Sequence, residues 1–199
     1  MSGTAKKNKV TYGLEKCHYA KGTLNEETGE ITYEEPVKLP GAVEMTVEPT
    51  GDQITFKADN IDYYKAPNNQ GYEGTLNLAL IPDKFLQEIL GEVENVEAGM
   101  ISEYSNAKTS PFALLFEFSG DQTETRHALY YCSATRPTVA SSTKDSGEPN
   151  TQELAFSSSP RPADKLVKSR TNGDVTTTQY NAWFEAVQEP PVETETEGA

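Results

Sequence analysis

The chain has 199 residues, with 31 acidic and 17 basic side chains, and its formal net charge is −14. That length suits one domain of ordinary size, or one domain with a tail. Phosphate binding needs clustered Lys and Arg, so the charge argues against a protein that coats nucleic acid or lies on an anionic membrane. Because only 35% of the residues are hydrophobic, the core must be built from few apolar side chains.

The sequence carries no signal for a membrane span or for secretion. Its longest apolar runs, Leu76–Ile81 and Phe112–Phe116, are the size of a strand, whereas a membrane helix needs roughly 20 residues. The stretch Met1–Lys9 is polar and no apolar stretch follows it, which indicates that no secretory signal is present. Cys17 and Cys132 are too few for a disulfide framework, and we expect two reduced, partly buried thiols.

Apolar and polar residues alternate along several segments, which predicts strands with one buried face. The run 43–48 places three apolar side chains on one face, those of Val43, Met45 and Val47. Ile54 and Phe56 share a face of the next run. Between the two runs, Pro49 presets φ and Gly51 permits positive φ, as a turn requires. The pattern predicts a hairpin of 43–48 with 54–58.

Two further runs show the same alternation. Leu76, Leu78 and Leu80 share one face of the first run. Four side chains share one face of the second, those of Phe112, Leu114, Phe116 and Phe118. The turn residues 119–122 follow, and after them the strand-like run 125–132. We therefore predict a second hairpin, of 112–118 with 125–132.

The spacing of apolar residues predicts two helices. The first has Phe85, Leu86, Ile89 and Leu90 on one face. Pro82 and Asp83 suit its first turn, and Gly91 supplies its C-terminal stop. The second candidate has apolar residues at i, i+3, i+4 and i+7, namely Tyr180, Trp183, Phe184 and Val187. It stops at Pro190–Pro191, and the threonines 176–178 before it favour β structure.

Three stretches lack a core pattern. Residues 92–108 are expected to form an acidic loop, and residues 141–150, rich in Ser, Thr, Gly and Pro, a mobile loop. The acidic residues after Pro191 are expected to be disordered. The predicted organisation is a flexible N-terminal arm at 1–8, one mostly β domain at 9–190, and a disordered acidic tail at 191–199.

The histidines and cysteines do not form a recognisable catalytic pair. Cys17 and His18 are neighbours in a predicted strand, so their side chains should point to opposite faces. His127 and Cys132 are an odd number of positions apart on one strand, and we expect them to face apart as well. The sequence also lacks a nucleophile elbow, a Walker loop, a dinucleotide fingerprint and a Cys-x-x-Cys pair. We therefore predict no catalytic residue and no enzyme activity.

Neither acidic nor aromatic clusters indicate a ligand. Asp59–Asp62 offers oxygen ligands for Ca²⁺ but lacks EF-hand spacing, and a polar turn between strands is the better interpretation. The tyrosines are expected to serve as core or interface residues, since little basic charge accompanies them for base stacking; they are Tyr63, Tyr64, Tyr72, Tyr130 and Tyr131. We predict no metal site, no cofactor-binding site and no cofactor.

Taken in order, the segments above resemble the phi13-type major tail protein family of long-tailed phages and prophages. The resemblance covers most of the chain, and each motif is weak alone while their joint order is more specific. The stretches that carry it are Val10–Leu14, Leu39–Val43, Phe56–Asn60, Gly71–Gly74, Phe85–Gly91, Pro111–Phe118, Arg126–Tyr130 and Trp183–Phe184.

This resemblance implies a tail-tube-type β-sandwich or partial barrel with one short flanking α-helix. It implies a virion structural protein that self-assembles into hexameric rings, which stack into a hollow tube around a tape-measure protein. A tail terminator and distal tail proteins are further implied partners. The phage genome passes through the lumen during ejection without specific binding. The implied location is the virion tail, assembled in the bacterial host cytoplasm.

Several physical features of the sequence suit such a role. Rings need head-to-tail interfaces, and stacking needs a further open interface. The lysines near the N-terminus, Lys6, Lys7 and Lys9, either meet an acidic surface of a neighbour such as 92–103 or form an unused terminus. A negative lumen would repel phosphates, so that DNA slides without adhering.

Two other classes of function stay open at the level of sequence. One is an acidic β-sandwich that binds carbohydrate or attaches to a cell surface, which would need an exposed aromatic platform. The other is a hydrolase with paired carboxylates, since acids are abundant and no particular pair stands out.

Overall fold

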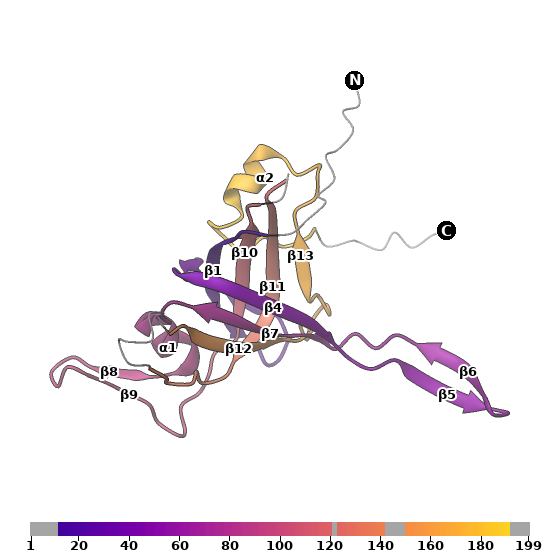
Figure 1. The fold of residues 1–199 in the computed structure, drawn as a ribbon, viewed down its shortest axis with the longest axis horizontal. Helices are drawn as coiled ribbons and strands as arrows, with labels where there is room; N and C mark the ends of the chain where they lie inside the picture. The colour runs from indigo at the N-terminus through magenta and orange to yellow at the C-terminus, as the bar shows by residue number, and fades with distance from the viewer. Residues whose placement is uncertain (1–11, 121–122, 142–149, 192–199) are drawn as a thin grey trace.

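The computed structural model describes residues 12–120, 123–141 and 150–191. Within them the chain is mostly β with two short helices, as predicted (Figure 1). The predicted N-terminal arm at 1–8 lies outside the described residues, as do 142–149 of the predicted mobile loop and 192–199 of the predicted tail. Neither helix in the described ranges is long and apolar enough to cross a membrane.

One antiparallel sheet forms the body of the molecule. Its strands follow the order β2-β1-β10-β11-β12-β7-β4, with β3 paired to β1 and β13 paired to β11. The strands are β1 (Leu14–Leu24), β2 (Ile31–Tyr33), β3 (Val37–Lys38), β4 (Ala42–Thr50), β7 (Gly71–Leu78), β10 (Phe112–Phe118), β11 (Thr125–Ala134), β12 (Gln152–Ser158) and β13 (Lys168–Arg170).

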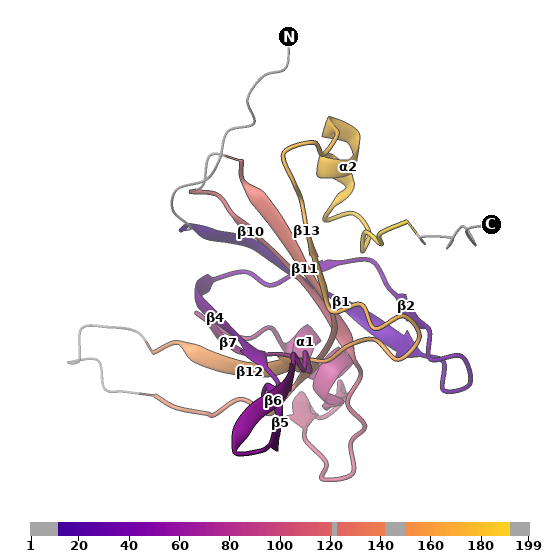
Figure 2. The same ribbon diagram turned by 90° about the vertical axis from the view of Figure 1, so that its right-hand side faces the viewer.

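The sheet curls over itself into a partial barrel. Strands β1, β10 and β11 cross over β12, β7 and β4 (Figures 1 and 2), and β4 comes into contact with β1. Helix α1 (Asp83–Leu90) packs into the same interior. We call this interior the main core; its fully buried side chains include Tyr19, Leu76, Leu78, Phe85, Phe112 and Leu154.

A second core lies on the opposite face of β1, β10 and β11, under helix α2 (Thr177–Ala182) and the residues that follow it. Its buried members are Ala20, Ala113, Leu115, Ala128, Tyr130 and Trp183. Strand β10 is thus covered on both faces. Its predicted alternation is confirmed, since Phe112, Leu114 and Phe116 enter the main core while Ala113 and Leu115 enter the second.

The predicted pairing of 43–48 with 54–58 is wrong. Strand β4 pairs with β7, and β5 (Ile54–Ala58) pairs with β6 (Ile61–Ala66). The chain does not reverse at Pro49, which lies within β4 opposite Tyr72. It reverses at Asp59 and Asn60, whose φ angles of 51° and 63° are those of a two-residue type I′ turn. The residues that reverse the chain are therefore Asp59 and Asn60, after β5, and not the residues 49–52 that the prediction used.

Two residues predicted to face the core, both in or beside strands of the main sheet, are exposed. Val43 is 60% exposed because the register of β4 shifts between Ala42 and Glu44, which turns Ala42 toward the core in its place. Leu80 is 65% exposed because β7 ends at Leu78, and Ile81 is the next side chain to be buried.

The first predicted helix forms, and the second forms only in part. Helix α1 has Pro82 at its N-cap, and Gly91 ends it in the left-handed conformation at φ 77°. Helix α2 ends at Ala182, so the apolar residues Trp183, Phe184 and Val187 of the predicted helix lie beyond its end. Its N-terminus corrects the β preference assigned to 176–178, since the Thr176 hydroxyl accepts from the Gln179 amide in a capping box.

The acidic segment 92–108 is not a simple loop. Strands β8 (Val93–Asn95) and β9 (Met100–Ser102) pair within it as an antiparallel hairpin. Alternation over three residues per strand is too short to be recognised by period alone, so the sequence did not indicate this hairpin.

Candidate assembly surfaces

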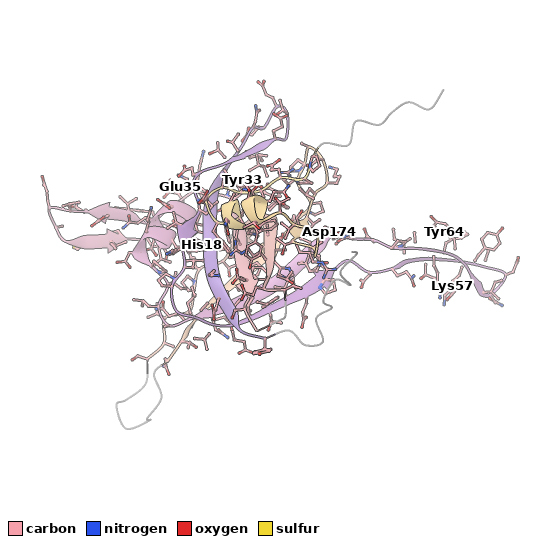
Figure 3. All side chains as sticks on the ribbon, turned by 90° about the horizontal axis from the view of Figure 1, so that it is seen from above. His18, Tyr33, Glu35, Lys57, Tyr64 and Asp174 are labelled. Carbon is pink, nitrogen blue, oxygen red and sulfur yellow. The ribbon has the colours of Figure 1, made fainter. Side chains whose placement is uncertain are left out.

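Two hairpins leave the body of the molecule in different directions (Figures 1 and 3). We call them the β5–β6 arm (54–66) and the β8–β9 arm (93–102). Each is a two-stranded sheet separate from the main sheet. Of the fourteen large hydrophobic side chains exposed in the described residues, nine lie on the arms: Ile54, Phe56, Ile61, Tyr63, Tyr64, Val93, Val96, Met100 and Ile101. An isolated two-stranded hairpin is marginally stable in water, and exposed apolar clusters of this kind mark contact surfaces.

The β5–β6 arm has apolar side chains and balanced charge. Phe56 lies opposite Tyr64 across the hairpin, and Figure 3 shows Tyr64 and Lys57 far out along the arm. Asp62 Oδ2 lies 2.9 Å from Lys65 Nζ, and its Oδ1 lies 3.9 Å from Lys57 Nζ. Ile54 and Phe56, predicted to share a buried face, are exposed at 54% and 60%. Among the residues that the structure describes, these side chains therefore lack a hydrophobic partner that buries them.

The β8–β9 arm is acidic as well as apolar. Residues 92–103 contain four glutamates and no lysine or arginine. Desolvation raises the pKa of Glu92, and the charges of Glu103 and Asp83 raise it further. Glu103 pairs with Arg136 at 2.7 Å (Oε1 to Nε), which ties the base of the arm to the segment after β11.

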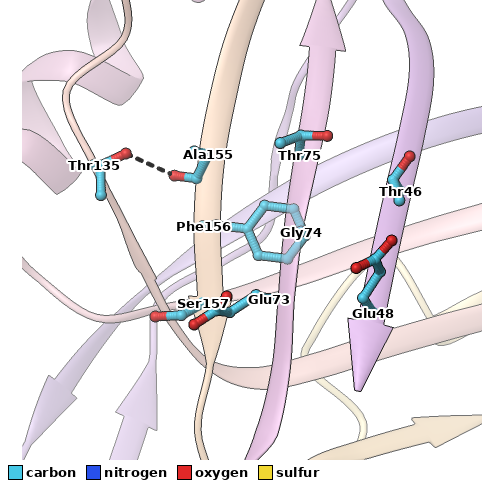
Figure 4. Close-up of a pocket in the computed structure, with 9 residues that line it drawn as sticks. All are labelled: Thr46, Glu48, Glu73, Gly74, Thr75, Thr135, Ala155, Phe156 and Ser157. Carbon is cyan, nitrogen blue, oxygen red and sulfur yellow. Dashed lines mark hydrogen bonds between the residues drawn. The ribbon is translucent and has the colours of Figure 1, made fainter. Parts of the chain in front are cut away.

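The outer face of β4, β7 and β12 is a second distinct surface. Its side chains form cross-strand rows, Glu48–Glu73–Ser157 and Thr46–Thr75–Ala155. A shallow groove of about 580 Å³ runs over these rows (Figure 4). A third row, Glu44–Asn77–Glu153, extends the face.

Like charges directly opposite each other on a sheet are destabilising, and Glu48 and Glu73 are such a pair. The surface is acidic, with the hydroxyl groups of Thr46 and Thr75 between its carboxylates.

A buried ion pair fixes the C-terminal segment to the sheet. Glu117 is fully buried and accepts from Arg126 Nε at 2.6 Å and from Lys16 Nζ at 2.7 Å. The Arg126 guanidinium lies 3.6 Å from the centroid of the Tyr180 ring and donates to the Tyr180 carbonyl. Buried charges persist when they are paired and hydrogen-bonded, so this cluster sets the position of α2.

A second set of contacts holds the end of the described chain. Arg161 Nη1 donates to Glu189 Oε1 at 2.7 Å, and its guanidinium also pairs with Asp164. The Tyr130 hydroxyl donates to the Gln188 carbonyl at 2.7 Å. These contacts anchor 183–190 on the second core. Sequence patterns did not indicate the contacts of Glu189 and Gln188, since their partners Arg161 and Tyr130 are far away along the chain.

Cys17 and His18 lie on opposite faces of β1, as predicted. Cys17 belongs to the main core, and the His18 ring stacks on Phe184 at 4.7 Å between centroids, on the other face. Desolvation lowers the pKa of His18 despite its hydrogen bond to the Lys16 carbonyl. Both cysteines are free and buried, as expected. Burial raises the pKa of each thiol to about 12, so neither is a thiolate nucleophile at neutral pH.

The prediction that His127 and Cys132 face apart is wrong. His127 lies opposite Phe116 and stacks on its ring at 5.0 Å, on the main-core face of the sheet. Cys132 is a main-core residue too. The pairing register of β11 with β10 shifts between Phe112 and Leu114, and this bulge inserts one extra residue that inverts the alternation.

The other residues considered as possible ligands, the stretch 59–62 and the tyrosines, lie in turns, in the core or on an exposed arm. Asp59 and Asn60 form the tip of the β5–β6 arm, while Asp62 pairs with lysines. Within the described ranges, no group of three or more His, Cys, Asp or Glu is placed to hold a metal ion. Tyr130 is a core residue, whereas Tyr63 and Tyr64 are exposed on the arm.

No protein-family model matches the chain, and no curated protein matches it. Solved structures resemble it at low identity, among them the following three. The anti-feeding prophage cap, which terminates the tube, is 14% identical, covers 86% of this chain and 99% of its own, and has a TM-score of 0.45. The sheath/tube terminator of PVC, an extracellular contractile injection system, is 11% identical. The match covers 79% of this chain and 94% of the terminator, with a TM-score of 0.46. A chain of the PVC sheath–tube complex is 12% identical. The match covers 82% of this chain and 94% of the other, with a TM-score of 0.48. Similarity of this degree does not establish a function.

Proposed function

We propose that this chain is a structural subunit of a phage-tail-like particle, and that it self-assembles into stacked hexameric rings of a tail tube. The observation that carries the proposal is the concentration of exposed apolar side chains on two arms outside the folded body. The resemblance of the sequence to phage major tail proteins supports the ring and the tube as the form of assembly.

The arms supply the kind of interface that repeated assembly needs. Their apolar side chains stand clear of the molecule that carries them, so they are free to be buried against another copy. An arm on one copy that meets a different surface on the next makes a head-to-tail contact, which either closes into a ring or continues as a filament. Burial of apolar surface contributes roughly 25 cal/mol per Å².

The outer face of β4, β7 and β12 is our candidate for the lining of the lumen. Its cross-strand rows carry Glu44, Glu48, Glu73 and Glu153, and no lysine or arginine lies in these rows. Such a surface would repel the phosphates of passing DNA. A tape-measure protein, a tail terminator and distal tail proteins are the partners that this role requires, in a virion tail assembled in the host cytoplasm.

Electron microscopy of the purified chain at rising concentration tests the proposal. We expect tubes or stacked rings. A single ring that never stacks would indicate a subunit that ends a tube instead of building it. A chain that stays monomeric at high concentration and binds a glycan would contradict self-assembly and favour the carbohydrate-binding alternative.

A further inference from the structure

A second groove opens between the edge strands β4 and β13, and its chemistry is complementary to the β8–β9 arm. Apolar side chains line most of it, and a lysine stands at its margin. We call it the β4–β13 groove; its defining residues are Met45, Val47, Tyr72, Phe116, Phe118 and Lys168. Its volume is about 260 Å³, below the roughly 300–1,000 Å³ of small-molecule sites. The tips of one or two protein side chains suit it better than a metabolite.

The cationic edge of the groove comes from β13. Lys168 Nζ lies 4.2 Å from the centroid of the Tyr72 ring, which holds the ammonium over the groove. Arg170, two residues further along, lies opposite His127, as Lys168 lies opposite Leu129. Both basic residues are therefore on the same face of β13, and both are exposed. Within the described residues, no carboxylate is within salt-bridge distance of either one.

The β8–β9 arm offers the opposite chemistry. Val96 and Met100 are exposed at 80% and 58% near its tip, and Glu94 and Glu97 flank Val96. The β5–β6 arm is apolar as well, but its lysines and aspartates balance, so charge does not direct it to a basic groove. Figure 1 places the β8–β9 arm and β13 on opposite sides of the molecule, so the arm belongs with the groove of another copy.

We propose that the β8–β9 arm of one copy docks in the β4–β13 groove of a second copy, with Val96 and Met100 in the apolar part and Glu94 and Glu97 beside Lys168 and Arg170. This contact is head-to-tail, so it repeats from copy to copy. It specifies one interface of the proposed self-assembly and rests on that function. One such contact is small compared with a standard interface of about 800 Å² per partner, so association through it is concentration-dependent.

Charge reversal tests both sides of the contact. The groove variant is Lys168→Glu with Arg170→Glu, and the arm variant is Glu94→Lys with Glu97→Lys. Sedimentation velocity over a concentration series measures association. We expect each variant alone to need about a tenfold higher concentration than the unmodified chain, since like charges then face each other across the contact. Lys38→Glu, an exposed site on β3, is the matched control and leaves association unchanged.

An equal mixture of the two variants gives the sharpest result. The acidic arm of the groove variant then meets the basic groove of the arm variant, and the reversed arm meets the reversed groove. We expect the mixture to associate as the unmodified chain does, although neither variant does so alone. Melting temperatures equal to that of the unmodified chain confirm that each variant is folded.

The outcomes separate this contact from the proposed function. If both charge variants associate and form tubes like the unmodified chain, the arm does not dock in this groove, and self-assembly stands. Loss of association that the mixture does not restore also overturns the pairing. If Phe56→Asp abolishes association while the charge variants do not, the β5–β6 arm makes the contact instead. An unmodified chain that remains monomeric at every concentration overturns both proposals.

Discussion

Glu117 shows how a single residue can connect distant parts of this fold. It lies on the face of β10 that points to the second core, where the alternation of Ala113 and Leu115 would call for an apolar side chain. Arg126 and Lys16 compensate its charge, and the same arginine packs against Tyr180. Burial raises the pKa of the Tyr180 hydroxyl to about 12, and the charge of Glu117 raises it too. The tyrosine therefore stays neutral within the cluster.

Removing Arg126 should destabilise the protein severely. The variant Arg126→Met leaves the Glu117 carboxylate buried with only Lys16 to pair with, and breaking a buried pair costs about 3–5 kcal/mol. Urea unfolding measures the loss. The double variant Arg126→Met with Glu117→Met removes both charges and should recover most of the stability. A single variant within about 1 kcal/mol of the unmodified chain would show that the pair contributes little.

Trp183 is a core residue by its position. It is 7% exposed, and its Nε1 donates to the His127 carbonyl at 3.4 Å. We expect Trp183→Ala to destabilise the chain by about 3–5 kcal/mol, visible as a lower melting temperature. Val139→Ala, at a site 92% exposed, serves as the control and should have little effect. Unchanged melting with loss of assembly would place Trp183 in an interface.

At the scale of elements, turn geometry decides where the arms begin. The segment between β4 and β7 is one long excursion whose outer part is the β5–β6 arm. The proline and glycine near residue 50 attracted the turn prediction, but the two consecutive positive-φ residues at 59 and 60 make the reversal. Since the β5–β6 arm pairs with no strand of the main sheet, its register depends on that turn alone.

Gly91 ends α1 at the base of the β8–β9 arm, and its replacement should be costly. A Cβ at this position would meet the Lys108 carbonyl oxygen at 2.8 Å, in addition to the strain of φ 77°. We expect Gly91→Ala to destabilise the chain by more than the roughly 1–2 kcal/mol of a left-handed alanine. Chemical denaturation measures the change.

The matched control is Gly99→Ala in the same segment. Gly99 also has a positive φ, of 62°, but a Cβ there would meet nothing within 4 Å. Its replacement should therefore show the conformational cost alone. If the two substitutions cost the same, the contact with Lys108 has been relieved by a small shift of the backbone.

At the scale of the whole molecule, side-chain contacts hold the end of the described chain on the second core. The last described contacts run through Gln188 and Glu189 to Tyr130 and Arg161. We expect truncation after Pro191 to leave the melting temperature and the assembly of the chain unchanged, because the acidic tail offers little apolar surface to bury. Calorimetry and electron microscopy of the truncated chain check this. Failure of the truncated chain to assemble would assign the tail a role between subunits.

The net charge takes on a different meaning once the fold is known. The carboxylates are not spread evenly, since four of them extend over the outer face of β4, β7 and β12 and others gather on the β8–β9 arm. The first surface suits passage of an anionic polymer, and the second suits contact with a basic groove. A total of −14 could not distinguish these two uses.

The sequence by itself determined the local structure wherever the spacing of apolar residues and the residues that begin or end an element indicated the same structure. The two-faced strand β10, helix α1 with its glycine stop and the hairpin of β10 with β11 follow from alternation and from residues that only one conformation suits. Cys17 and His18 lie on opposite faces, as the same period predicts for two neighbours in a strand.

Only the tertiary structure decided the rest. The pairing of β4 with β7 and the packing of Tyr180 on Arg126 join residues distant along the chain. The bulge that brings His127 and Cys132 to one face depends on how β11 pairs with β10. Local propensity carries no information about such partners, since the same alternating strand can pair with several others. The exposure of the apolar side chains on the two arms was also decided by the tertiary structure. An apolar face is exposed or buried according to what the rest of the fold places against it.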